Sequence, residues 1–178
     1  MKLTKWLVVP AVCSAMVLTG AAMALADTTV EIKDVHLCCG ACVKGVGAAL
    51  KGVEGVKPKC DQKAKTVTIT GTDDAAVQKA LDALGAAGYY GDTGSKTLTI
   101  KAPAGLPTGK VTTLKLANAH NCCRGCCVAI KKAVAGVNGV KGDTAKPKTA
   151  KFEVTGDFEA ADVIKALNAA GFQAQVEK

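Results

Sequence analysis

The sequence predicts an α+β protein in which two tandem ferredoxin-like βαββαβ units follow an N-terminal signal peptide. Three observations support this fold class: an apolar leader, an internal repeat with an offset near 84 residues, and the same order of strand-like and helix-like patterns in both copies. Each unit should place two helices on one face of a four-stranded antiparallel sheet. We expect a signal peptide at 1–26, a first unit at 27–102, a linker at 103–109 and a second unit at 110–178.

The first 26 residues have the three parts of a secretory signal peptide. Two lysines precede an apolar run from Leu7 to Leu18, and Ala24-Leu25-Ala26 offers a small-x-small cleavage site before Asp27. The run is too short for a comfortable membrane span. The sequence therefore predicts a periplasmic or secreted product with no membrane insertion after cleavage.

The charge of the remaining chain does not favour nucleic acid as a partner. Of 23 basic residues, 21 remain without Lys2 and Lys5, against 15 acidic ones, which gives a net charge of +6. The excess is nearly all lysine spread along the chain, with one arginine and few aromatic residues. Nucleic-acid surfaces usually cluster arginine and aromatic side chains. We expect the lysines to be mainly solvated surface.

Four blocks recur in the same order in the two halves of the chain. The matched pairs are 36–42 with 120–126, 52–56 with 136–140, 67–71 with 152–156, and 84–89 with 167–172. Their offsets are 84, 84, 85 and 83 residues, so the blocks slip by only one or two positions. This pattern predicts a duplicated domain.

The elements of one unit follow from its apolar spacing. Val43, Val46, Leu50 and Val53 recur at helical intervals after the cysteine loop. In chain order the first unit should contain a strand at 29–35, the cysteine loop, a helix stopped by Gly55, strands at 56–61 and 65–70, a helix from Asp73 to Gly88, and a final strand within 90–102. The final strand is the element with the weakest pattern. Pro103, Gly105, Pro107 and Gly109 then mark the linker.

Cysteine spacing indicates metal or redox chemistry. An even number of cysteines in an exported protein usually forms a disulfide framework. Here seven of the eight that follow the leader lie in two tight groups: Cys38, Cys39 and Cys42, and Cys122, Cys123, Cys126 and Cys127. Structural bridges join distant parts of a chain, so this clustering argues against such a framework.

Each cysteine group lies between the predicted first strand and the first helix of its unit. That position places Cys42 and Cys126 at a helix N-terminus, where the dipole and unpaired N–H groups favour thiolate. Cys39 and Cys123 lie about one turn away, so both sulfurs of each CxxC pair can reach one ion. Thiolates suit Cu(I), Zn(II), Cd(II) or Hg(II), and neither loop has the carboxylates that Ca²⁺ or Mg²⁺ prefers.

On these residues the unit resembles the heavy-metal-associated domain, which occurs in copper chaperones, metal-exporting ATPases and the periplasmic mercury-binding protein. Cys39 and Cys42, like Cys123 and Cys126, match the family's metal-binding Cys-x-x-Cys pair. Tyr89 and Phe172, each after Ala-Gly, match its aromatic position near the metal loop. The resemblance covers nearly all of the chain after the leader, twice. It implies the ferredoxin-like fold and the binding of Cu(I), Zn(II) or Hg(II), up to one ion per domain.

Both loops depart from the family's Gly-Met-x-Cys-x-x-Cys pattern in the same way. His36-Leu37-Cys38 and His120-Asn121-Cys122 replace Gly-Met-x, and the two histidines are the only ones in the chain. A Cys₃His set would complete the tetrahedral shell of zinc. Adjacent cysteines diverge, so three ligands per site, or a site shared between the loops, are also open. The predicted ligands are Cys39, Cys42, Cys123, Cys126, Cys38, Cys122, His36 and His120.

Two cysteines are expected to have no role as ligands. Cys127 falls at the position of Val43 on the apolar helix stripe, where a free thiol packs as a small hydrophobe. Cys60 has no counterpart in the second copy, and its place on the predicted second strand indicates a buried, inert thiol.

The sequence thus predicts a binding protein without catalytic turnover: a metal chaperone, scavenger or resistance protein. The expected partners are metal ions and a metal-transporting membrane protein or efflux component. One alternative is a thiol–disulfide oxidoreductase, because CxxC at a helix N-terminus is also redox machinery. The absence of thioredoxin-type βαβ order and Trp-x-x-Pro surroundings argues against it. A third reading is an interaction module whose loops are locked by disulfides.

Overall fold

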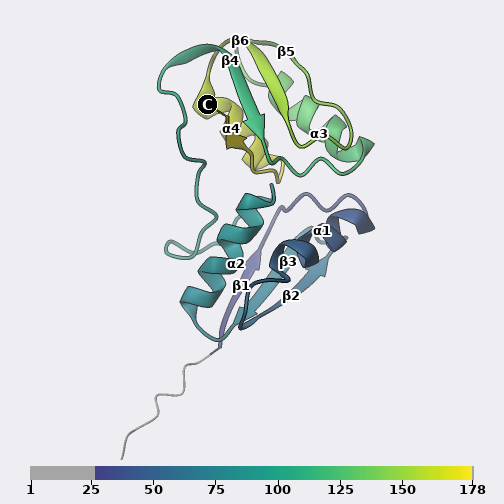
Figure 1. Cartoon of the computed structure of the whole chain (residues 1–178), viewed down its shortest axis with the longest axis vertical. Helices are drawn as coiled ribbons and strands as arrows, with labels where there is room; N and C mark the ends of the chain where they lie inside the picture. Colours follow the sequence, from purple (N-terminus) through teal and green to yellow (C-terminus); the bar gives the residue numbers. More distant parts are fainter. Residues whose placement is uncertain (1–26, 178) are drawn as a thin grey trace, which may run out of the picture.

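The computed structural model describes residues 27–177, so the proposed signal peptide lies outside the described residues. The chain forms two α+β units, each with an antiparallel sheet and two helices (Figure 1). The first contains β1 (Thr28–Ile32), α1 (Gly40–Leu50), β2 (Val56–Asp61), β3 (Thr66–Gly71) and α2 (Asp74–Ala86). The second contains β4 (Lys110–Ala117), α3 (Arg124–Ala135), β5 (Val140–Asp143), β6 (Phe152–Glu159), α4 (Ala160–Ala169) and β7 (Gln175–Val176).

The second unit has the expected four-stranded sheet. Its strand order is β5-β6-β4-β7, and all three pairings are antiparallel. Phe152, Val154 and Phe158 of β6 point into the core, and Val163, Ile164 and Leu167 of α4 pack from the helix side. This alternation in the strand and helical spacing in α4 explain why these residues form these elements.

The first unit has a three-stranded sheet in the order β1-β3-β2, so the expected fourth strand within 90–102 is wrong. This segment makes one bridge just beyond the end of β1. There the N–H groups of Lys33 and Asp92 donate to each other's carbonyls at 2.8 and 3.0 Å. The Asp92 carboxylate then accepts from the N–H of Gly94 at 2.8 Å and turns the chain away.

Beyond this turn the segment packs against helix α2 instead of continuing the sheet. The side chain of Gln78 makes both backbone hydrogen bonds of Thr99, at 2.9 and 3.2 Å. Leu98 and Ile100 are buried there. The side chain of Gln78 thus forms the hydrogen bonds that the backbone of Thr99 would make with a neighbouring strand in a four-stranded sheet.

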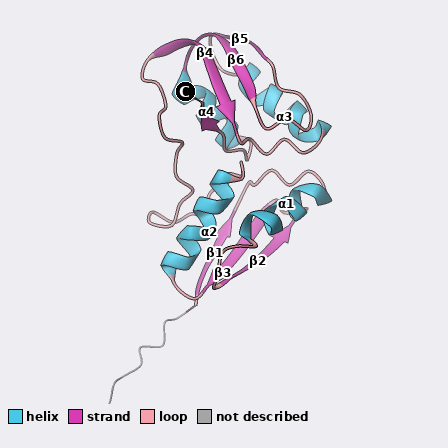
Figure 2. Cartoon of the chain, in the orientation of Figure 1, coloured by secondary structure: helices cyan, strands magenta, loops and turns pink. Residues whose placement is uncertain are grey.

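Cartoon colouring by secondary structure shows the long loop segment that joins the two units (Figure 2). It runs along the left side in this view, whereas α1 and α3 lie on the right. Within residues 27–177, no helix is both long and apolar enough to cross a membrane.

Candidate metal centre

The two cysteine loops have the same backbone conformation. Each begins with a left-handed residue, Asp34 at φ 58° and Asn118 at φ 57°. Each ends at an extended cysteine that precedes the helix, Cys39 at φ −156° and Cys123 at φ −151°. The equivalent loops thus present equivalent thiols at the N-termini of α1 and α3.

The two units contact each other directly at the ends of α2 and α4. Tyr89 and Phe172 form an antiparallel bridge, the N–H of Gln173 donates to the carbonyl of Gly88 at 3.0 Å, and that of Tyr90 donates to Gly171 at 3.2 Å. The Gln173 side chain is fully buried and donates to the Lys101 carbonyl at 2.7 Å. Equivalent residues therefore meet across the interface.

Two glycines allow this approach. Gly88 and Gly171 have φ values of +86° and +84°. A Cβ on Gly88 would lie 2.2 Å from the backbone nitrogen of His120, and one on Gly171 would lie 2.4 Å from that of His36. Each glycine thus seats the histidine loop of the other unit, where no side chain fits.

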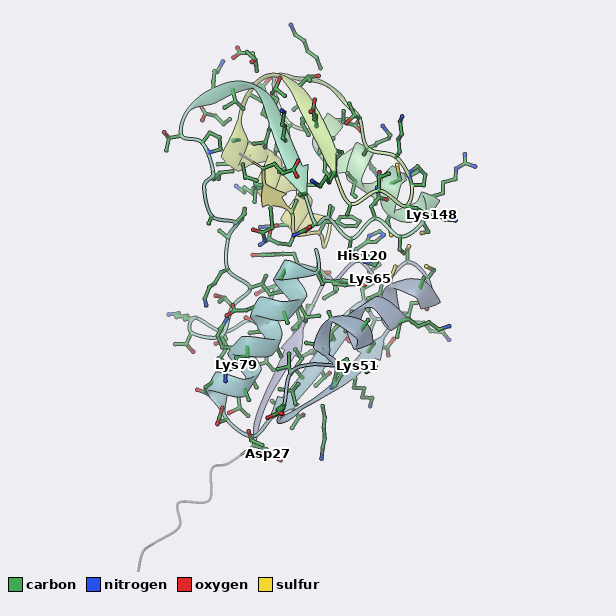
Figure 3. The ribbon with its side chains drawn as sticks, in the orientation of Figure 1. Asp27, Lys51, Lys65, Lys79, His120 and Lys148 are labelled. Atoms are coloured by element: carbon green, nitrogen blue, oxygen red, sulfur yellow. The ribbon has the colours of Figure 1, made fainter. Side chains whose placement is uncertain are left out.

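Six thiols from both loops come together in one cluster. The Sγ–Sγ distances that join the units are 3.4 Å for Cys38–Cys123, 3.6 Å for Cys38–Cys126, 3.7 Å for Cys42–Cys122 and 3.9 Å for Cys42–Cys126. Within the units they are 3.6 Å for Cys38–Cys42, 3.8 Å for Cys39–Cys42, 3.7 Å for Cys122–Cys126 and 3.7 Å for Cys123–Cys126. Sulfur atoms gather between the two halves on the side of His120 (Figure 3).

The histidines cross between the units. His36 stacks on Phe172 with ring centroids 4.3 Å apart, and His120 stacks on Tyr89 at 4.2 Å. The Tyr89 hydroxyl donates to the Cys42 carbonyl at 2.8 Å and lies 3.2 Å from Nε2 of His120. Phe172 has no hydroxyl, and the buried Nε2 of His36 has no hydrogen-bond partner within residues 27–177.

Three groups within the cluster place their ligand atoms within 4.8 Å of one another: Cys42, His120, Cys122 and Cys126; His36, Cys38 and Cys126; and Cys38, Cys39 and Cys123. All eight predicted ligands occur in these groups. Clustered Cys and His side chains of this kind can hold a soft or borderline metal ion.

Among residues 27–177, the two cysteines outside this cluster are Cys60 and Cys127. Cys127 is buried, with its thiol 3.5 Å from the Ala145 carbonyl, which confirms its predicted place in the core. Cys60 is only half-buried and is therefore more exposed than the buried thiol that was predicted. It lies on β2, which pairs on one side only, at the edge of its sheet.

Ionisation differs among the thiols. The backbone N–H of Cys126, in the first turn of α3, lowers the pKa of Cys123 to about 6. Burial raises the pKa of Cys122 to about 12. Burial and then the hydrogen bond with Cys123 raise the pKa of Cys38, whereas burial and the charge of Cys42 raise that of Cys126. The metal-free cluster therefore holds protons that a bound cation would displace.

The imidazoles are held in the neutral form that binds metals. Burial lowers the pKa of His120 to about 4, and the charge of His36 acts in the same direction. Burial followed by the positive charge of Lys65 lowers the pKa of His36. At neutral pH both rings therefore have a free nitrogen lone pair.

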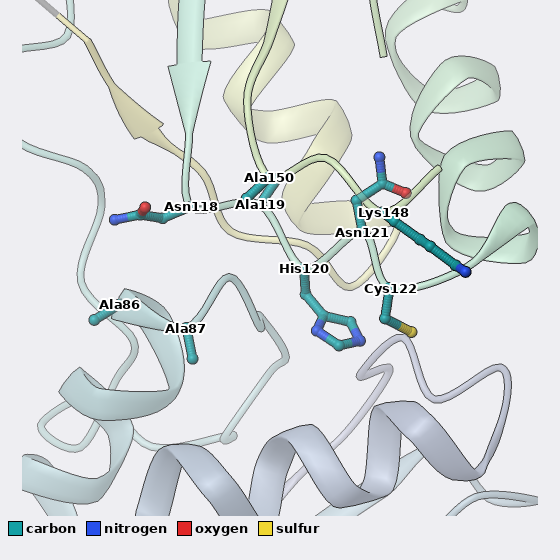
Figure 4. Close-up of a pocket in the computed structure, with 9 residues that line it drawn as sticks. All are labelled: Ala86, Ala87, Asn118, Ala119, His120, Asn121, Cys122, Lys148 and Ala150. Carbon is teal, nitrogen blue, oxygen red and sulfur yellow. The ribbon is translucent and has the colours of Figure 1, made fainter. Parts of the chain in front are cut away.

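A solvent-open groove of about 430 Å³ reaches the cluster from one side. His120 and Cys122 line it, together with Lys148 and with Ala86 and Ala87 at the end of α2 (Figure 4). Asn121 is buried in the groove wall, where its amide donates to the carbonyls of Lys146 and Thr149 at 2.8 and 3.1 Å. Those bonds hold the 146–149 loop beside the groove.

The sequence did not show that each unit completes the loop of the other. Tyr89 and Phe172 were identified only as aromatic positions near a metal loop, and the structure stacks each on the imidazole of the opposite unit. The repeated Ala-Ala-Gly before both aromatics is a signal from which a close approach could have been inferred.

No model of a known protein family matches the sequence, and no curated protein matches it. Among solved structures, the chain is similar to the N-terminal soluble domains of Bacillus subtilis CopA, with 16% identity, coverage of 87% of this chain and 97% of that one, and a TM-score of 0.32. A second structure, of the water-soluble region of the P-type ATPase CopA from Bacillus subtilis, has 16% identity, coverage of 87% and 94%, and a TM-score of 0.28. These superpositions are loose. The chain's capacity to hold a metal is therefore inferred from its own cysteines and histidines.

Proposed function

We propose that this chain is an exported, non-catalytic protein that binds soft or borderline metal ions, Cu(I), Zn(II) or Hg(II), as a metal chaperone, scavenger or resistance protein. The observation that carries the proposal is the cluster of six free thiols, flanked by two neutral histidines, at the contact between the loops. Cysteines clustered in this way commonly bind soft metal ions as thiolate ligands.

The contacts around the cluster support a binding role. Tyr89 and Phe172 hold the imidazoles by stacking, and Gly88 and Gly171 fix the loops on which they lie. Supporting contacts that fix the orientation of ligands are typical of metal sites. The groove at His120 and Cys122 offers a route by which a partner, such as a metal-transporting membrane protein or efflux component, would exchange the ion.

Native mass spectrometry of the reduced chain, titrated anaerobically with Cu(I), Zn(II) and Hg(II), tests this proposal. We expect retained metal in the wild type and none above background when Cys39, Cys42, Cys123 and Cys126 are all replaced by serine. Cys60→Ser is the matched control, because this thiol lies outside the cluster. A wild type that retains no more metal than the fourfold variant would refute metal binding.

One observation favours thiol–disulfide exchange as a second candidate. Cys123 is partly exposed and its pKa is lowered to about 6, so it is a thiolate at neutral pH with Cys126 3.7 Å away. Reduction of insulin disulfides measures this activity. Catalytic turnover that disappears in Cys123→Ser would establish exchange in place of the binding role.

A further inference from the structure

Two thiols at the centre of the cluster are related in a way that separate metal sites would not need. Cys42 and Cys126 both lie in the first turn of a helix, α1 and α3, and are both 0% exposed. They are 3.9 Å apart, across the contact between the units. Each also contacts Cys38 and Cys122, the first cysteine of each loop.

These contacts form two triangles of sulfur that share one edge. Cys42, Cys126 and Cys122 are separated by 3.9, 3.7 and 3.7 Å. Cys42, Cys126 and Cys38 are separated by 3.9, 3.6 and 3.6 Å. Exchange of the two units converts one triangle into the other.

Each triangle has an imidazole beside it. The ligand nitrogen of His120 lies within 4.8 Å of all three sulfurs of the first triangle. That of His36 lies within 4.8 Å of Cys38 and Cys126 in the second. The buried Nε2 of His36, which has no hydrogen-bond partner in the described part of the chain, is an independent sign of a missing ligand there.

The triangle edges have the size of a tetrahedral thiolate site. At a metal–sulfur distance of about 2.3 Å, two sulfurs of a tetrahedron are about 3.8 Å apart, whereas two sulfurs in linear coordination are about 4.6 Å apart. The five edges of the two triangles range from 3.6 to 3.9 Å. They therefore fit tetrahedral coordination and are too short for linear coordination.

We propose that the interface holds one dinuclear centre for two divalent, zinc-like ions, in which Cys42 and Cys126 bridge both ions. Cys38 and His36 complete the shell of one ion, and Cys122 and His120 that of the other. The inference rests on the proposed metal binding and replaces independent CxxC sites by a single shared one.

Charge favours divalent ions at this position. Four thiolates and two neutral imidazoles balance two divalent cations, so the centre is neutral. Two monovalent ions would leave two negative charges around Cys42 and Cys126, which have no exposure to water. Uncompensated charge is costly to bury.

The arrangement assigns a different role to Cys39 and Cys123, the first cysteine of each CxxC pair. Cys39 and Cys123 lie in a separate group with Cys38, which is the most exposed thiol of the three. They touch the bridging sulfurs at 3.8 and 3.7 Å but belong to neither triangle. We assign them to the exchange of ions with the solvent or a partner, outside the resting ligand set.

Native mass spectrometry with Zn(II) separates this centre from two independent sites. The dinuclear centre predicts two ions in the wild type, two ions in Cys39→Ser/Cys123→Ser, and loss of both ions in Cys42→Ser alone. Independent CxxC sites predict two ions in the wild type, none in the double variant and one in Cys42→Ser. One ion in wild type, or one retained in Cys42→Ser, overturns the centre while leaving metal binding intact. If the wild type retains no metal, the proposed function is refuted as well.

A measurement on the wild type removes any dependence on variants that fold poorly. Loading with ¹¹³Cd(II) reports on bridging directly, because two cadmium nuclei that share a thiolate show scalar coupling in the ¹¹³Cd spectrum. We expect two resonances, each split by the other. Two unsplit resonances at full loading would overturn the shared centre. Tyr89→Phe should move the resonance of the His120 ion more than that of the His36 ion, because Tyr89 contacts both His120 and the bridging Cys42.

Discussion

Replacement of Gly88 by alanine should weaken metal binding without unfolding either unit. Gly88 has a left-handed backbone, which costs an L-residue about 1–2 kcal/mol. The new Cβ would also lie 2.2 Å from the His120 nitrogen and 2.3 Å from the Asn118 carbonyl oxygen. Backbone cannot rotate out of the way as a side chain can, and such overpacking costs about 1–3 kcal/mol.

The left-handed backbone is a local cost to the first unit, whereas the steric clash falls on the contact between the units. In the metal-free variant the units can separate and relieve the clash, but a shared site forms only when they close again. The steric penalty of closing, about 1–3 kcal/mol, should therefore weaken metal affinity by roughly 5- to 150-fold. Circular dichroism should be unchanged.

The assay is competition for Zn(II) against a chromophoric chelator, at fixed pH and with reduced protein. Gly47→Ala is the matched control, because this glycine lies within helix α1 and a Cβ there meets nothing within 4 Å. It should leave the affinity unchanged and stabilise the protein by about 0.5–1 kcal/mol. If both variants bind Zn(II) equally well, the metal site does not depend on contact between the loops.

Three further predictions concern ionisation and packing. In the reduced, metal-free chain, alkylation of Cys123 should rise with a midpoint near pH 6 while Cys122 stays unreactive, because their pKa values are about 6 and 12; equal labelling of both in tandem mass spectrometry would contradict this. The pKa of a histidine is about 6.5 in the unfolded chain, whereas that of folded His120 is about 4. As the pH falls from about 6.5 to 4, the unfolded state therefore takes up a proton that the folded state does not, and the metal-free protein loses stability. After allowance for the partial exposure of the ring, the loss should be about 1–2 kcal/mol. Denaturant titrations at both ends should show a smaller loss in His120→Gln, and an equal loss would count against it. Cys127→Ala should cost about 1 kcal/mol of unfolding free energy and leave the metal stoichiometry unchanged, because its buried thiol packs away from the cluster; a lost ion would place it among the ligands.

Local periodicity was enough to predict most elements of the fold. Helix α1 begins at Gly40 and β2 spans Val56–Asp61, in agreement with the apolar stripe and the strand pattern. The prediction of a fourth strand in the first unit was wrong because two side chains, Asp92 and Gln78, form hydrogen bonds with the backbone of this segment. Such competition leaves no periodic signal in the sequence.

The ligand types at the site could be predicted, but not the way in which the loops meet. The paired Cys and His motifs identified all members of the cluster. The contact between the loops depends on tertiary docking, in which Gly88 and Gly171 accept the backbone of the opposite unit. Spacing along one chain cannot specify such a contact, so an independent ion per unit and a shared site were equally open from sequence.

The bridge between Tyr89 and Phe172 has the character of an isologous dimer interface enclosed within one chain. The same patch faces itself, as in a symmetric pair of identical subunits. A covalent link removes the need for the two faces to remain identical. Leu37 in one half and Asn121 in the other show the result, since both are buried at equivalent positions but only the amide secures a neighbouring loop. A single half expressed alone would retain a self-complementary face and should associate with a second copy of itself.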